Sequence, residues 1–227
     1  SERRDTYGKY AELLVERGDP VADLAHLRLR FLGGLAAFAQ LLLELLHMTR
    51  QREVFANQRA ELRGDLELLA LASYFAQVTE TISQEDAPDP ELLSLLLNCL
   101  YMLSERRYPC AQLKAIYELR ALTLAGYMPD VLACADCGKY DGGDFYLDPV
   151  EGRLLCADCA DKARHLPNLD NGALYALRHI CLAEDKKLFG FKISPESLQE
   201  LSRTSEQYTL AHLEHGLKSL DFLKTVL

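Results

Sequence analysis

The chain has 227 residues, of which 49% are hydrophobic and 26% are charged, and its formal net charge at pH 7 is −9. This length and composition suit one large domain or two modest domains with a real hydrophobic core. No stretch is apolar for long enough to span a membrane, and nothing resembles a secretory signal, so we predict a cytoplasmic protein with no membrane contact. The net negative charge, taken alone, opposes nucleic-acid binding.

The charge is unevenly distributed along the chain. Residues 1–64 contain ten Lys/Arg and nine Asp/Glu, whereas residues 65–227 contain fifteen and twenty-five. A contact with a polyanion is therefore expected near the N-terminal arginines, with Arg106 and Arg107 as a second candidate. The alternative for each arginine is an ordinary solvated surface charge. The candidate DNA-binding residues are Arg28, Arg30, Arg50, Arg52, Arg59 and Arg63.

The first 55 residues do not predict a single structure. Residues 11–16 suit a short strand or a turn of helix, and the Gly-Asp-Pro sequence at 18–20 then interrupts the chain. Leucines and arginines partly alternate over residues 24–31, which favours a strand with its arginines facing outward. Residues 38–55 fit both a helix and a pair of strands, and both alternatives stay open.

A clear helical pattern begins at Arg59. Apolar residues then recur at three- and four-residue steps, which predicts a helix of roughly five turns with one buried face. After a polar loop over residues 84–90, Asp89 can cap a new helix, and Pro90 suits its first position. The predicted buried face of the first helix consists of Leu62, Leu66, Leu69, Ala70, Ser73, Tyr74 and Val78.

Three further helical stretches are predicted. One runs over about residues 109–124 and ends at Gly126, and a second begins at Asp170. The last is capped by Ser194 and follows as one or two helices. Its predicted buried stripe consists of Leu198, Leu201, Leu210, Leu213, Leu217, Leu220, Leu223 and Leu227.

Two C-x-x-C pairs are the strongest chemical signal in the sequence. The first is Cys134 and Cys137, the second is Cys156 and Cys159, and 18 residues separate them. Each pair can bend round one side of a tetrahedral zinc ion, and the residues between them suffice for a small β-hairpin with turn residues at 148–152. Four thiolates leave no coordination position for water or substrate. We therefore predict a zinc ribbon that holds one structural zinc ion.

The cysteine pattern has two alternatives to a structural zinc site. Redox-active C-x-x-C motifs belong to βαβ surroundings, and no βαβ pattern surrounds either pair, so zinc is favoured. A zinc hydrolase would need one cysteine off the metal. The remaining cysteines, Cys99, Cys110 and Cys181, suit buried thiols in a reducing cytoplasm. The sequence also contains no G-x-S-x-G, H-E-x-x-H or P-loop motif, and we predict that the protein is not an enzyme.

An ordered set of features resembles a known family. The most specific is a helix that ends in Gly126-Tyr127-x-Pro129 just before the four cysteines. The other features are Asp65-Leu66, Ala72-Ser73-Tyr74-Phe75-Ala76 and Glu80; Tyr117-Glu118-Leu119-Arg120; Gly138, Phe145 and Gly152; and His215-Gly216-Leu217-Lys218-Ser219-Leu220 with Leu223. Together they cover about residues 55–227 and resemble the RecO family of bacterial recombination mediators.

The resemblance implies a function as well as a fold. Proteins of the RecO family bind single- and double-stranded DNA, anneal complementary strands and have no enzymatic activity. They contact the C-terminal tail of single-strand binding protein and work with RecR to load RecA. By the same resemblance, Cys134, Cys137, Cys156 and Cys159 are zinc ligands, and the protein is expected in the cytoplasm in association with the nucleoid.

The resulting expectation is an α+β protein. An OB-type β-barrel over residues 1–57 precedes an α-helical bundle, whose two parts (58–132 and 163–227) flank an inserted zinc ribbon (133–162). An OB barrel normally needs roughly 70 to 80 residues, so the barrel is expected to be reduced or incomplete in this chain. The competing hypothesis, which the net charge favours, is a zinc-stabilised protein–protein adaptor that does not bind DNA directly.

Overall fold

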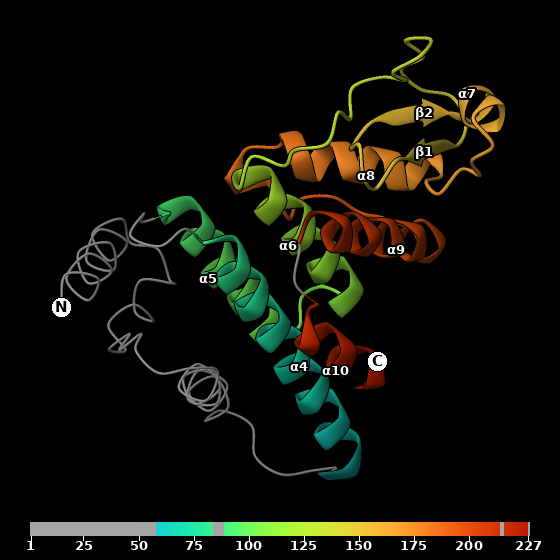
Figure 1. The fold of residues 1–227 in the computed structure, drawn as a ribbon. Helices are drawn as coiled ribbons and strands as arrows, with labels where there is room; N and C mark the ends of the chain where they lie inside the picture. Colours follow the sequence, from blue (N-terminus) through green and yellow to red (C-terminus); the bar gives the residue numbers. More distant parts are fainter. Residues whose placement is uncertain (1–57, 84–88, 214–215, 227) are drawn as a thin grey trace. The chain divides into compact units, whose positions relative to one another are not determined.

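The computed structural model describes residues 58–83, 89–213 and 216–226, which form helices and one small sheet (Figure 1). The helical body and the ribbon are thus confirmed for this part of the chain, while the predicted barrel of residues 1–57 lies outside the described residues. The helices are α4 (Gln58–Ile82), α5 (Pro90–Ser104), α6 (Cys110–Leu124), α7 (Ala157–Lys162), α8 (Asn171–Leu182), α9 (Pro195–His212) and α10 (Lys218–Val226). A 3-10 turn, η2 (Asp185–Lys187), follows α8, and the strands are β1 (Phe145–Leu147) and β2 (Leu154–Cys156).

Side-chain caps begin three of the helices where the sequence predicts them. Asp89 accepts a hydrogen bond from the Leu92 N–H at 2.9 Å, and Pro90 occupies the first turn of α5. Asp170 caps α8 in the same way, and Ser194 caps α9. Each cap satisfies a backbone donor that has no partner inside the helix, and this local chemistry fixes where the helix starts.

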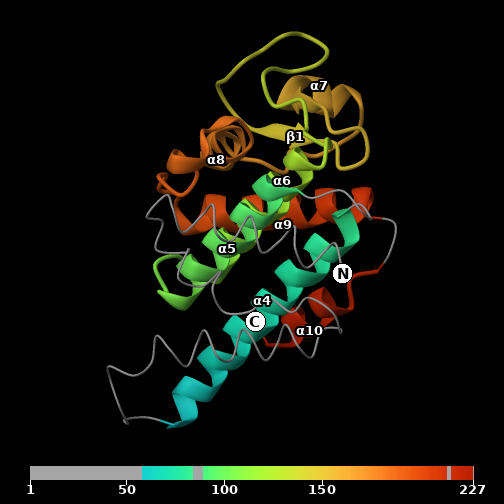
Figure 2. The same ribbon diagram turned by 90° about the vertical axis from the view of Figure 1, so that its left-hand side faces the viewer.

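The described residues divide into two compact units, and the first contains α4, α5 and α10. Helix α10 runs alongside α4 (Figure 2). The Gln77 side chain of α4 accepts hydrogen bonds from the backbone N–H and the hydroxyl of Ser219, in the first turn of α10. Gln77 therefore caps the first turn of α10 from a neighbouring helix.

The buried face of α4 matches the predicted one in part, because Ala70, Tyr74 and Val78 are buried as predicted. Leu66 is 42% exposed, and Leu69 and Ser73 are half-buried. The buried positions instead include Leu68 and Leu71, which the prediction did not include. A helix that contacts both α5 and α10 buries more than one stripe, so a single periodic face does not describe it. The other buried residues of α4 are Ala70, Ala72, Tyr74, Phe75 and Val78.

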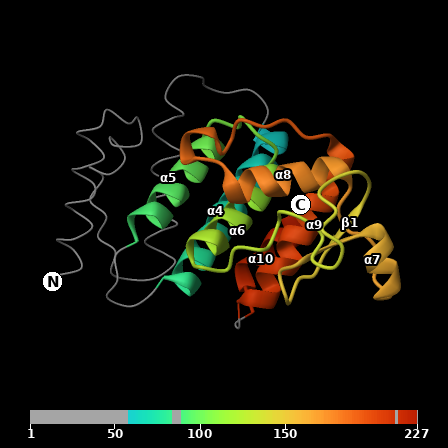
Figure 3. The ribbon, with the colours of Figure 1, turned by 90° about the horizontal axis from the view of Figure 1, so that it is seen from above.

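The second unit spans residues 111–216 and carries the ribbon. Helices α8 and α9 lie side by side in this unit (Figure 3). Their N-terminal ends are joined, because the Ser197 hydroxyl of α9 donates a 2.6 Å hydrogen bond to Asp170, the cap of α8. Gly172 permits this approach, since a Cβ there would overlap the Ser197 hydroxyl.

Within the described ranges, no helix combines the length and the apolar character needed to cross a membrane.

The buried side of α9 is rich in hydroxyl groups, so the predicted leucine stripe holds only in part. Leu210 is 42% exposed and Leu198 is half-buried, whereas Leu201 is buried as predicted, as are Leu213, Leu217, Leu220 and Leu223 farther along the chain. The buried polar side chains on α9 are Ser197, Thr204, Ser205 and Thr209. Polar side chains can replace leucines inside a protein only when they are hydrogen-bonded. These four are hydrogen-bonded, to neighbouring segments or to the preceding turn of α9.

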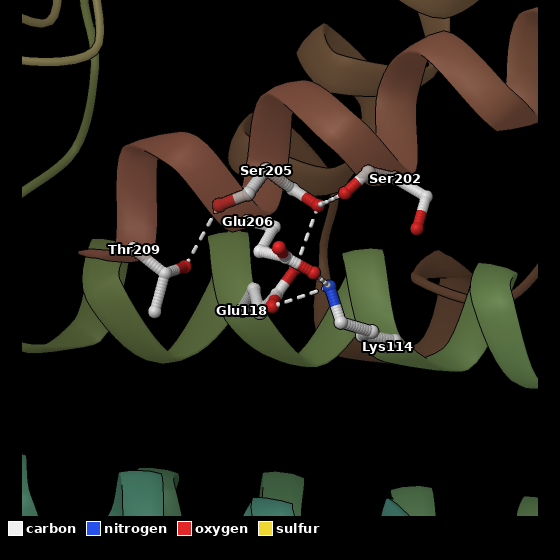
Figure 4. A network of polar contacts seen from close by, with 6 residues as sticks. All are labelled: Lys114, Glu118, Ser202, Ser205, Glu206 and Thr209. Carbon is white, nitrogen blue, oxygen red and sulfur yellow. Dashed lines mark hydrogen bonds and ion pairs between the residues drawn. The ribbon is translucent and has the colours of Figure 1, made fainter. Parts of the chain in front are cut away.

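An ion-pair network on α6 and α9 accounts for part of this polarity (Figure 4). The Lys114 ammonium lies 2.8 Å from a carboxylate oxygen of Glu118 and 2.9 Å from one of Glu206. Ser205 donates a 2.6 Å hydrogen bond to the other oxygen of Glu118, which is fully buried. The Ser205 hydroxyl of α9 and the Lys114 ammonium therefore stabilise a carboxylate that water does not reach.

Candidate metal centre

The two strands of the ribbon are antiparallel, and their register places Cys156 opposite the first residue of β1. Phe145 is opposite Cys156, and Leu147 is opposite Leu154. Each strand has only three residues, and its apolar side chains are buried. A hairpin of this size is marginal by itself and needs further contacts to be stable.

Both edges of the hairpin are covered by other segments. Beside β1, Phe145 exchanges backbone hydrogen bonds with Leu169, and the Asn168 side chain bonds the N–H and C=O of Leu147. Beside β2, the Asp130 and Ala135 N–H groups donate to backbone carbonyls of residues 152 and 154. The ribbon therefore presents no open strand edge over this span, and its position is fixed from two sides.

A tight backbone turn holds the first pair of cysteines. The Cys134 N–H donates to the Lys139 carbonyl at 2.8 Å, and the Gly138 N–H donates to the Cys134 carbonyl at 2.9 Å. Gly138 has φ +73°, a left-handed conformation that favours glycine. This turn brings the Cys137 sulfur back toward the one on Cys134.

The second pair lies where β2 changes into α7. Cys156 is the last residue of β2 and the residue that precedes α7, and Cys159 is in the first turn of that helix. The change from strand to helix turns the chain within three residues, so both sulfurs reach the same point. The sequence analysis did not predict the short helix α7.

The four cysteines meet at one place. Their sulfur atoms all lie within 4.8 Å of one another, and the sulfurs of Cys137 and Cys156 are 3.6 Å apart. A tetrahedral zinc ion with bonds of about 2.3 Å would hold its sulfurs about 3.8 Å apart. Cys134, Cys156 and Cys159 are buried and Cys137 is exposed. The cluster has the donor type, number and spacing needed to hold one metal ion.

The protonation of these thiols also suits a cation. Although burial raises the pKa of Cys134, hydrogen bonds from the backbone of Cys156, Cys137 and Asp136 lower it to about 6. Burial, together with the neighbouring sulfurs, raises the pKa of Cys159 to about 12. Ionising a second thiol beside the Cys134 thiolate therefore costs free energy, unless a positive ion balances the two negative charges. A divalent metal would supply that charge, and its binding would release protons.

Arg178 attaches this cluster to helix α8. Its guanidinium donates hydrogen bonds to the backbone carbonyls of Val131 at 2.7 Å, Leu132 at 2.9 Å and Tyr140. It also lies over the Tyr140 ring, 4.2 Å from the centroid. The Arg178 side chain thus joins the segments on both sides of the first cysteine pair. This role of Arg178 was not predicted from the sequence.

Tyr208 of α9 contacts the turn between the two strands. Its hydroxyl donates to the Tyr127 carbonyl at 3.0 Å, and Gly152 approaches the ring so closely that a Cβ there would lie 2.9 Å from the hydroxyl oxygen. Gly152 also has φ +67°, which favours glycine for a second reason. The turn is therefore fitted to α9, and Gly152 is the residue that permits it.

The described residues include two of the six predicted DNA-binding arginines. Arg59 and Arg63 lie in helix α4. Arg106 has a positive φ of 50° after α5, and Arg107 lies 3.9 Å from Glu105. The remaining candidates, Arg28, Arg30, Arg50 and Arg52, lie outside the described residues.

The described part of the chain is thus a helical protein with a four-cysteine ribbon inserted between α6 and α8. A family model described as "Recombination protein O C terminal" matches residues 63–221. The chain belongs to the RecO family.

Curated relatives named "DNA repair protein RecO" show the same similarity. The protein from Acetivibrio thermocellus is 32% identical over 166 residues, which are 73% of this chain and 66% of the relative. The protein from Symbiobacterium thermophilum is 29% identical over 169 residues, covering 73% and 67%. The protein from Roseiflexus is 32% identical over 167 residues, covering 73% and 58%. The matched part of the chain thus spans about two thirds of the length of the first two relatives and 58% of the length of the third.

Proposed function

We propose that this chain is a non-enzymatic mediator of DNA repair and recombination. The observation that carries the proposal is the RecO family match over residues 63–221, together with relatives that are named DNA repair proteins. In this role the protein binds single- and double-stranded DNA, promotes strand annealing and contacts the C-terminal tail of single-strand binding protein. It helps RecR to load RecA, and it acts in the cytoplasm at the nucleoid.

Within this proposal, Cys134, Cys137, Cys156 and Cys159 bind one zinc ion with a structural role. Four sulfur donors at tetrahedral spacing support zinc, and they leave no open position for a substrate or a water nucleophile. The energy of metal binding would stabilise a hairpin whose strands have three residues each. The zinc hydrolase hypothesis is therefore not favoured.

Metal analysis of one variant pair tests the zinc proposal. Cys156→Ser is expected to lose the metal and loosen the hairpin while most of the helical circular dichroism remains. Cys110→Ser, which changes a half-buried cysteine outside the cluster, should keep the metal. Equal metal content in both variants would refute the assignment. Complete unfolding of Cys156→Ser would show that the metal holds the whole helical part together.

The DNA contacts are proposed for the basic N-terminal part, which we assign to an OB-like domain over residues 1–57. Replacing Arg28, Arg30, Arg50 and Arg52 together by alanine should weaken the binding of a labelled single-stranded oligonucleotide and reduce its salt dependence. Arg59→Ala and Arg63→Ala should also weaken the binding of this oligonucleotide. As a control, Arg164 and Arg203 are exposed arginines of the acidic part, and their replacement should change little. Unchanged affinity in the fourfold variant would place the contacts elsewhere.

A second candidate function is favoured by the charge. Residues 65–227 contain fifteen basic and twenty-five acidic residues, which suits a zinc-stabilised adaptor that reaches DNA only through partner proteins. A salt series of oligonucleotide binding separates the two functions. Affinity that falls steeply with salt supports direct contacts to phosphates, whereas no binding at low salt supports the adaptor.

A further inference from the structure

In the second unit, two exposed tyrosine rings lie beside the buried guanidinium of Arg178, which also bonds the backbone carbonyl of the exposed Leu132. Leu132 is 57% exposed, Tyr140 55% and Tyr175 46%, whereas Arg178 is only 5% exposed. The guanidinium carbon of Arg178 lies 4.2 Å from the ring centroid of Tyr140 and 5.9 Å from that of Tyr175. We call Leu132, Tyr140 and Tyr175 the Tyr140 surface. Exposed apolar side chains that gather in this way mark interaction sites more often than scattered ones do.

The backbone beneath the Tyr140 surface is held in place before any partner binds. Arg178 bonds the carbonyls of both Leu132 and Tyr140, and the Tyr175 hydroxyl lies 3.4 Å from a carboxylate oxygen of Asp141. A tyrosine has few rotatable bonds, and a fixed backbone loses little further freedom on binding. The surface is thus preorganised for contact, which lowers the entropic cost of association.

The exposed charged residues nearest to Tyr140 in the sequence are negative. Asp136, Asp141 and Asp144 are exposed and lie within four residues of Tyr140, whereas Lys139 is half-buried. None of the three aspartates has an ion-pair partner among the residues that the structure describes. Four thiolates outweigh the charge of one divalent ion, so a filled metal site adds negative charge here. Arg178 supplies one buried positive charge against this excess.

This combination disfavours nucleic acid and favours a basic polypeptide. Exposed tyrosines can stack on nucleobases, but the aspartates would repel the phosphates that accompany each base. A basic segment would instead pair with the aspartates, place an apolar side chain between the rings, and set its own cations over the tyrosine faces. We propose that the Tyr140 surface binds a partner protein through a segment that carries Lys or Arg beside a large apolar residue. The inference does not depend on the proposed DNA contacts, which lie on other residues.

A peptide selection tests the proposal on the full chain. A displayed library of random twelve-residue peptides is first depleted on the Tyr140→Ala/Tyr175→Ala protein and then selected on the unchanged protein. Circular dichroism and metal content confirm beforehand that the variant is folded. The enriched peptides are expected to carry net positive charge and a large apolar residue. Enrichment of acidic or uncharged peptides, or no enrichment after depletion, would overturn the proposal.

Binding of one selected peptide, labelled and followed by fluorescence anisotropy, locates the contact. Tyr140→Ala and Tyr175→Ala should each weaken binding roughly tenfold or more. Asp141→Asn should weaken it less and reduce its salt dependence. Leu182→Ala is the matched control, because Leu182 also lies on α8 and is 50% exposed, and it should leave binding unchanged. If Tyr140→Ala loses the metal, Tyr175→Ala alone decides the outcome.

The same variants distinguish a nucleic-acid surface. A labelled single-stranded oligonucleotide should bind the unchanged protein and the Tyr175→Ala variant equally well. Oligonucleotide affinity that falls in Tyr175→Ala would assign the surface to nucleic acid and overturn the proposal. Loss of oligonucleotide binding in the N-terminal arginine variant, with peptide binding intact, would leave it standing.

Discussion

Replacing Lys114 by methionine is expected to destabilise the second unit by about 3–5 kcal/mol, the cost of removing one partner from a buried ion pair. The Lys114 side chain is 4% exposed and that of Glu118 is fully buried. Methionine has a similar length but no charge, so the substitution would remove the cation that lies between Glu118 and Glu206 (Figure 4). Denaturant unfolding, followed by circular dichroism, measures the loss.

A second variant and a control show whether the buried charge is the cause. Lys114→Met/Glu118→Gln removes both charges and keeps an acceptor for the Ser205 hydroxyl. Its loss of unfolding free energy should be about 1–3 kcal/mol smaller than the sum of the losses measured for Lys114→Met and Glu118→Gln separately. Lys187→Met removes a cation 3.0 Å from Glu184 in a pair whose side chains are 68% and 75% exposed. It should cost at most about 1 kcal/mol. Equal losses in Lys114→Met and Lys187→Met would refute the reasoning.

The same contact predicts a pH dependence. Burial alone would lower the pKa of Lys114, but the attraction and hydrogen bonds of Glu118 and Glu206 outweigh it and raise the pKa above its ordinary value of 10.5. A raised lysine pKa gives a stabilisation that is complete below the ordinary value and is lost as pH rises through the higher one. The stability gap between the unchanged protein and Lys114→Met should therefore stay constant from about pH 7 to 9 and shrink only above 10.5. A gap that shrinks between pH 7 and 9 would contradict this assignment.

Two further changes probe how the ribbon is attached, each measured by denaturant unfolding. Gly152→Ala should cost about 2–4 kcal/mol, because φ is +67° and the new Cβ would lie 2.9 Å from the Tyr208 hydroxyl oxygen. Gly126→Ala has φ +90° and open space, so it should cost only about 1 kcal/mol, and equal losses would contradict the steric argument. Arg178→Met should cost about 3 kcal/mol or more by leaving the buried Val131 carbonyl and the partly buried Leu132 carbonyl unpaired, whereas Arg203→Met, at an exposed position, should cost almost nothing.

The features predicted correctly from the sequence rest on local chemistry. Asp89, Asp170 and Ser194 each start a helix with their own side chains, so a few neighbouring residues suffice to predict the boundary. The meeting of the four cysteines was also predicted from residues close together in the sequence. Their spacing restricts the fold strongly enough that the sequence predicts a common site, and the structure brings their sulfurs together.

The incorrect predictions concern which face of a helix is buried. Leu210 was predicted inside and is exposed, while Thr204 and Ser205 are buried. Hydrophobic periodicity treats a hydroxyl as a surface group, although Thr204 bonds the Asn168 carbonyl and Ser205 bonds Glu118. Both partners are distant in the sequence, so no local pattern could have found them.

Arg178 was missed for a related reason. It lies in a mostly apolar helix, next to His179, and its three acceptors are backbone carbonyls 38 to 47 residues earlier in the chain. Backbone acceptors leave no mark on the sequence. A basic residue on the apolar side of a predicted helix near a metal motif was the available signal, because a charge placed there needs buried partners.

These contacts divide the support of the ribbon between the metal and the helices. Metal binding would join the two cysteine pairs to each other, but it cannot fix how the hairpin lies on α8 and α9. Arg178 fixes the segments around the first pair, and Tyr208 with Gly152 fixes the turn between the strands. The helices therefore position the ribbon, and the metal would hold it closed. It follows that the Tyr140 surface, whose backbone is bonded by Arg178, depends on the helix contact as much as on the metal.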